Sequence, residues 1–130
     1  MASTPEFVKT PRIEVVNIAT ANTATDGTGT VTTLIQGASG GTRVLELVAK
    51  GAATTAIANV NIFLSVDSGT TWRLFDTISV SAVTSGNATP TFRGRVTYTN
   101  LLLSGTTQRI GVTTTIAQST NVVALGGDLV

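Results

Sequence analysis

The sequence predicts an all-β protein: a single β-sandwich of about eight antiparallel strands, jelly-roll or Ig-like in strand order, with an extended N-terminal arm. Apolar residues recur at every second position in several segments, which is the period of a half-buried strand. Threonine is the most abundant residue, and helix-length runs of helix-forming residues are absent. Short Gly/Ser/Thr connections separate the segments at roughly even spacing. The length of 130 residues suits one domain.

The first segment, residues 1–12, is expected to be the extended arm, followed by the sandwich domain at 13–130. Pro5 and Pro11 disfavour regular structure within the arm. Phe7 and Val8 are its apolar anchor, and they could hold it against a neighbouring subunit.

The strands expected in the domain span residues 13–19, 31–35, 42–50, 59–66, 72–80, 91–99, 107–116 and 121–129. The 42–50 segment alternates like a strand, although LELVAK within it also suits a helix. Asp26-Gly27 marks a turn in the polar connection at 20–30. Residues 100–106 are expected to form a turn that carries exposed leucines.

The clearest pair of strands is a β-hairpin at residues 59–80, with Gly69 in its turn. Residues opposite one another in an antiparallel pair share a face, which fixes the parity of the register. The predicted register pairs Val60 with Ile78, Ile62 with Asp76, Leu64 with Leu74 and Val66 with Trp72. Phe63 then lies opposite Phe75 on the second face, and Asp76 falls among apolar residues, where it needs a hydrogen-bond partner.

Charge and composition exclude several classes of function. Only 12% of the residues are charged, and the net charge is +1, so we expect no direct contact with nucleic acid or an anionic membrane. We find neither a signal peptide nor an apolar run that could span a membrane, which indicates a soluble protein assembled in the cytoplasm. Such a weakly charged surface is typical of a protein whose surface is covered by binding partners.

Catalytic and metal sites are not expected. Histidine and cysteine are absent, which excludes His-dependent triads, thiolate metal sites and disulfides. Asp67 and Asp76 are the nearest carboxylate pair in the hairpin, but a turn aspartate plus a hydrogen-bonded strand aspartate explains them better than glycoside hydrolysis does. The loop at Asp26 lacks the further acidic ligands of a calcium site. We therefore predict no enzyme activity and no cofactor.

Arg93 and Arg95 are two positions apart in the 91–99 strand and therefore lie on the same face, with Tyr98 nearby. Together they could bind a sugar or a carboxylate, but paired arginines on a sandwich strand are more often a solvated or interface surface.

Two segments carry a resemblance to a known type of protein. IFLSVDSGTTWRLFDTISV at residues 62–80 and NVVALGGDL at residues 121–129 resemble small structural proteins of tailed-phage virions, with a D-x-G-T turn, an R-L-[LF]-D strand and a last strand ending in GGD. The resemblance covers the chain from about Arg43 to its end.

The resemblance implies a capsid decoration, or cement, protein on the outside of a phage head, often trimeric and bound to subunits of the major capsid protein. Two alternatives stay open: a tail or baseplate component of similar fold, and a carbohydrate- or receptor-binding module. The candidate interface residues are Phe7, Val8, Phe63, Phe75, Arg93, Arg95 and Tyr98.

Overall fold

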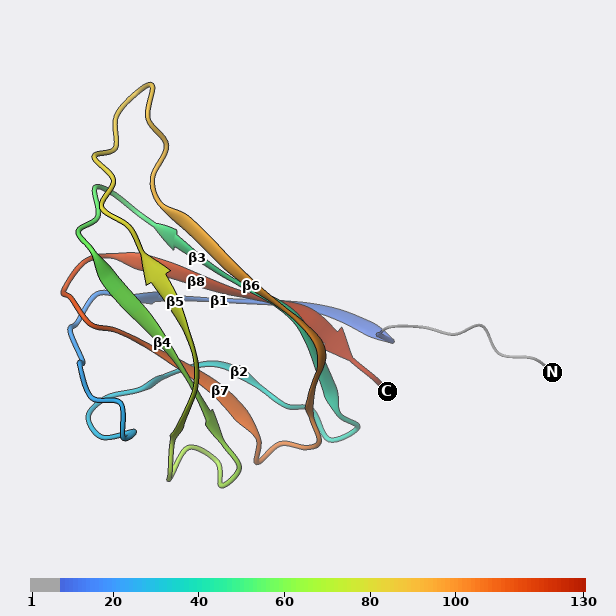
Figure 1. Ribbon diagram of the computed structural model, residues 1–130. Helices are drawn as coiled ribbons and strands as arrows, with labels where there is room; N and C mark the ends of the chain where they lie inside the picture. The colour runs from blue at the N-terminus through green and yellow to red at the C-terminus, as the bar shows by residue number, and fades with distance from the viewer. Residues whose placement is uncertain (1–7) are drawn as a thin grey trace.

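The computed structural model describes residues 8–130, which form eight β-strands and no helix. The strands are β1 (Thr10–Ile18), β2 (Thr32–Gln36), β3 (Thr42–Gly51), β4 (Ala58–Ser65), β5 (Arg73–Val80), β6 (Arg93–Leu103), β7 (Arg109–Thr114) and β8 (Thr120–Asp128). They make two four-stranded sheets, in the orders β1-β8-β3-β6 and β2-β7-β4-β5, which stack against each other (Figure 1). The all-β sandwich that the sequence predicts is confirmed.

The strand order is that of a jelly-roll. β1 pairs with β8, β2 with β7, β3 with β6 and β4 with β5, as in one long hairpin. Rolling this hairpin brings β3 beside β8 and β4 beside β7, which closes the two sheets. Every one of these pairings is antiparallel, and the Ig-like alternative is excluded by this order.

The core lies between the two sheets and is built from alternate residues of each strand. The sheet containing β3 contributes Val44 and Leu47, and the opposing sheet contributes Ile62, Ile110 and Val112, all of them fully buried. Burial of one aliphatic side chain stabilises the folded state by about 1.5–3 kcal/mol, so burial of these core residues is the main driving force for folding.

Two strand boundaries differ from the expected ones by more than two residues. β1 begins at Thr10, so residues 10–12 belong to the sandwich and only the part before them can act as an arm. Phe7 lies outside the described residues. β6 continues to Leu103, whose side chain is buried, and so the turn expected at residues 100–106 starts later. No part of residues 8–130 forms a helix of the length and apolarity needed to cross a membrane.

The β4–β5 hairpin follows the predicted register at first. Val60 pairs with Ile78 and Ile62 with Asp76, as expected. Gly69 in the turn has a φ of 86°, the left-handed conformation that the sequence predicts for it. The register then shifts, with consequences for the aromatic side chains.

Candidate interaction surface

The predicted Phe63–Phe75 pair does not form. A β-bulge lies between Ile62 and Phe63, where Phe63 pairs with Leu74 and leaves Phe75 as the extra residue of β5. The predicted pairing of Leu64 with Leu74 is wrong for the same reason. A bulge redirects the inserted side chain, and here it separates the two phenylalanines.

Phe63 is fully buried, at 0% exposure, in a second apolar cluster on the outer face of its sheet. Gly111 lies opposite it in β7, and a side chain at Gly111 would meet the Trp72 ring 2.9 Å away. Gly27, in the loop between β1 and β2, packs against the backbone of Trp72 with a φ of 86°. Val31 of the same loop closes over Gly111. The chain itself therefore covers Phe63, which is not exposed on the surface of the described residues.

Phe75 and Tyr98 close one open side of the sandwich, where β5 and β6 approach each other. Their ring centroids are 5.5 Å apart, and the Tyr98 hydroxyl donates a hydrogen bond of 2.9 Å to Asp76. Asp76 thereby gains the partner that its apolar position requires. Burial, followed by the bond to Asp76, raises the pKa of Tyr98 above its ordinary value. Phe75 is still 40% exposed, whereas Tyr98 is half-buried.

Arg93 and Arg95 lie on the outer face of β6, both exposed, as their alternation predicts. Arg95 makes an ion pair of 3.6 Å with Glu46 of β3. Lys50 pairs with Arg93 across the two strands, so this end of the face is basic. Tyr98 does not join the arginines, because it points to the open side of the sandwich.

The same outer face carries an apolar stripe that the sequence did not single out. Val15, Val123 and Val48 lie side by side across β1, β8 and β3, and Ile13 pairs with Leu125 in the neighbouring row. Ile13 is 70% exposed and Val15 59%, and the other three are half-buried. We call these five residues the outer apolar face. Contiguous exposed apolar surface of this kind marks an interaction site more often than a scattered residue does.

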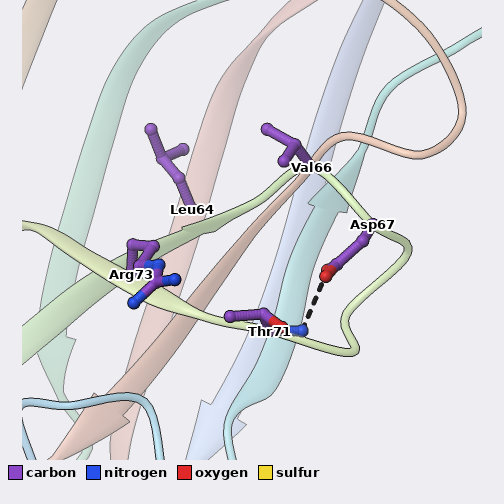
Figure 2. A pocket seen from close by; sticks show the side chains of 5 residues that line it. All are labelled: Leu64, Val66, Asp67, Thr71 and Arg73. Carbon is purple, nitrogen blue, oxygen red and sulfur yellow. Dashed lines mark hydrogen bonds between the residues drawn. The ribbon is translucent and has the colours of Figure 1, made fainter.

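A hollow of about 370 Å³ opens at the β4–β5 turn. Figure 2 shows Leu64 and Val66 projecting in the same direction, with Thr71 and Arg73 opposite them. Asp67 accepts bonds from the Thr71 backbone N–H (2.9 Å) and the Ser65 hydroxyl (2.8 Å), which together lower its pKa. Its carboxylate is thus fixed as a turn-forming group, in agreement with the sequence interpretation.

The GGD sequence at the end of β8 links β1, β8 and β3 at one end of their sheet. Asp128 accepts bonds from Arg12 (3.1 Å) and from the Thr42 hydroxyl (2.9 Å). A side chain at Gly126 would collide with the carbonyl of Arg43, next to a register shift in β3. The motif is therefore explained by packing at this end of the fold.

Val8 packs near this end of the fold as well, since a side chain at Gly127 would lie 2.7 Å from its Cβ. Val8 is half-buried, and the Lys9 backbone N–H bonds to the Asp128 carbonyl (2.7 Å). Val8 therefore acts at least in part as an intramolecular anchor.

The described part of the chain offers no group of three or more acidic side chains that could hold a metal ion, and the sequence contains neither histidine nor cysteine. Comparison with known proteins found no matching family model and no curated protein of significant similarity. Because it exposes adjacent apolar side chains, the surface most suited to an interaction is the outer apolar face, with its basic border at Arg93, Arg95 and Lys50.

Proposed function

We propose that this protein is a non-enzymatic structural component of a phage particle, a decoration protein that binds the outside of the head. The outer apolar face carries the proposal, because a monomer gains nothing from exposing Ile13 and Val15 on a flat sheet. The resemblance of residues 62–80 and 121–129 to virion proteins supports the same conclusion. The jelly-roll adds only an analogy, since that architecture serves capsid and lectin domains alike.

The proposed mechanism is additive. Each copy lays its outer apolar face on subunits of the major capsid protein and bridges neighbours in the shell. Arg93 and Arg95 border the contact and favour a capsid surface with carboxylates at the matching position. Many copies with modest individual affinity then resist the pressure of packaged DNA together. The trimer that the resemblance implies stays a prediction.

The test is to add the purified protein to expanded heads that lack it. We expect saturable, stoichiometric binding and a higher melting temperature of the shell, because a ligand that binds only the assembled state stabilises it. Val123→Lys, at the centre of the outer apolar face, should abolish binding. Ile57→Lys is the matched control, since Ile57 is 76% exposed in a loop away from this face.

Absence of binding to any head would refute the proposed function, and stoichiometric binding to tails would favour the tail or baseplate alternative. Equal binding by the Val123→Lys variant would show that another surface is used. The carbohydrate-binding alternative gains no support from Tyr98, because its ring packs on Phe75 and its hydroxyl is engaged by Asp76. A glycan array whose hits vanish in Tyr98→Ala would reverse that conclusion.

A further inference from the structure

The four edge strands of the two sheets differ in how well they are protected. Proteins usually blunt an open edge by making it short, bulged or charged. β2 has five residues and a register shift, β5 carries the bulge at Phe75, and β6 is basic and shifts in register against β3. β1, in contrast, pairs with β8 over all nine of its residues without a shift. Among the described strands, β1 is the regular edge.

The directions of the backbone groups in β1 follow from the bonds of its neighbours. The Ala52 N–H donates to the Ser119 carbonyl (3.1 Å), and the Leu129 N–H donates to the Gly41 carbonyl (3.0 Å). Odd-numbered residues of β8 therefore face β3, and even-numbered ones face β1. Because the β1–β8 register pairs even with even numbers, the odd-numbered residues of β1 point to the open edge. Pro11 agrees with this, since proline in a sheet places its nitrogen on the free side.

We propose that β1 pairs antiparallel with β1 of a second copy, about a two-fold axis at Ile13, so that two sheets join into one. In this register the N–H and C=O groups of Ile13 bond reciprocally between the copies. Charge complementarity selects the register, because Arg12 of each copy then lies opposite Glu14 of the other. Both side chains are only partly buried, and Arg12 already makes a 2.8 Å bond to its own Glu14.

The joined sheet also places the two outer apolar faces next to each other. Ile13 of one copy meets Ile13 of the other, and the apolar stripe becomes continuous across the axis. Each copy has one such edge, so a contact of this kind closes at two copies. The inference is independent of the proposed function, and it assigns a dimer where the resemblance implies a trimer.

Sedimentation velocity of the purified chain tests the pairing. We expect a dimer for the natural sequence, and monomers for Ile13→Lys and for Ile13→Glu, because each places like charges at the axis. An equimolar mixture of the two variants should restore the dimer. Ile57→Lys, the matched control, should stay dimeric, and circular dichroism should show that all variants are folded, since Ile13 is 70% exposed.

A monomer or a trimer of the natural sequence at the highest soluble concentration would overturn the proposal, as would two charged variants that stay dimeric or fail to recombine. Hydrogen exchange gives a second readout. The amides of Ile13 and Val15 should be protected in concentrated samples and should exchange rapidly on dilution. If the chain dimerises but the exchange rates of these amides do not depend on protein concentration, the contact lies elsewhere and the pairing is refuted.

Discussion

The outer faces of the two sheets contrast with each other. The outer face of the β2-β7-β4-β5 sheet carries Phe63 and Trp72, and the loop between β1 and β2 covers both of them. The outer face of the β1-β8-β3-β6 sheet carries Ile13 and Val15, which stay exposed. Both sheets have four strands and share one core, so the difference lies in whether the chain supplies a cover.

Apolar residues on the outer face of a sandwich can therefore have two different roles, in folding or in binding. On the covered side, glycines make room for the cover: Gly111 receives the Trp72 ring, and Gly27 allows the loop to approach. On the open side, half-buried valines lie flat beside the exposed Ile13 and Val15. The covered face stabilises the fold, and the open face is available to a partner.

The largest expected effect is on the covered face. Phe63→Ala should lower the free energy of unfolding by about 3–5 kcal/mol, because it leaves a cavity under a loop that cannot collapse fully. Val15→Ala should change it by less than about 0.5 kcal/mol, as is usual for an exposed site. Urea unfolding followed by Trp72 fluorescence measures both. Similar losses in the two variants would show that the faces do not differ in the isolated chain.

A smaller effect is expected at the end of the sheet where Asp128 of β8 contacts both β1 and β3. Asp128→Ala should cost about 1–3 kcal/mol, because it leaves the Arg12 guanidinium and the Thr42 hydroxyl without their shared acceptor. Glu46→Ala removes the partner of the exposed Arg95 and should cost no more than about 1 kcal/mol. Thermal unfolding of both variants compares them. Equal costs would mean that the Asp128 cluster adds no more than a surface pair.

The hydrogen bond from Tyr98 of β6 to Asp76 of β5 predicts that the stability of the fold depends on pH. The pKa of Tyr98 is raised in the folded chain, by burial first and by the bond to Asp76 second. Its contribution to stability is complete below the ordinary tyrosine pKa of about 10 and is lost as the pH rises toward the folded value, since the unfolded state ionises first. Tyr98 is the only tyrosine, so spectrophotometric titration reports on it alone.

Two outcomes decide this prediction. In the folded chain, the phenolate signal should appear at a higher pH than the ordinary tyrosine pKa of about 10. In urea it should appear near that ordinary pKa. In Tyr98→Phe the loss of stability on raising the pH across that range should be reduced. An ordinary titration curve in the folded chain would contradict the placement of Tyr98 against Asp76.

Local alternation was sufficient to predict the strands, because each half-buried strand repeats its own pattern. It could not predict the hairpin register beyond Ile62. The bulge makes Phe75 an extra residue of β5, and nothing in the residue types of the strand marks that position. The covering of Phe63 depends on Trp72 and Gly111, which come together only in the folded chain.

The open face escaped prediction for a different reason. In β1 the polar Arg12 and Glu14 point toward the sandwich interior, where Arg12 reaches Asp128, while Ile13 and Val15 point outward. Apolar residues occur at both parities of this strand, since Val16 and Ile18 pack in the core, so alternation indicates a strand here without identifying its buried face. Arg93 and Arg95 were placed correctly, since their strand follows the usual rule.

The smallest expected change in stability comes from the open face and uses two adjacent residues of β8. Val122 is buried in the core and Val123 lies on the outer apolar face, so Val→Thr at each position makes the same chemical change on opposite sides of one strand. Val122→Thr should cost about 1–3 kcal/mol for burying a hydroxyl. Val123→Thr should cost less than about 0.5 kcal/mol in the isolated chain, because water reaches the hydroxyl, and yet it should weaken binding to the shell. Unfolding and shell-binding curves of the two variants measure these effects, and equal unfolding costs would show that the face is not open.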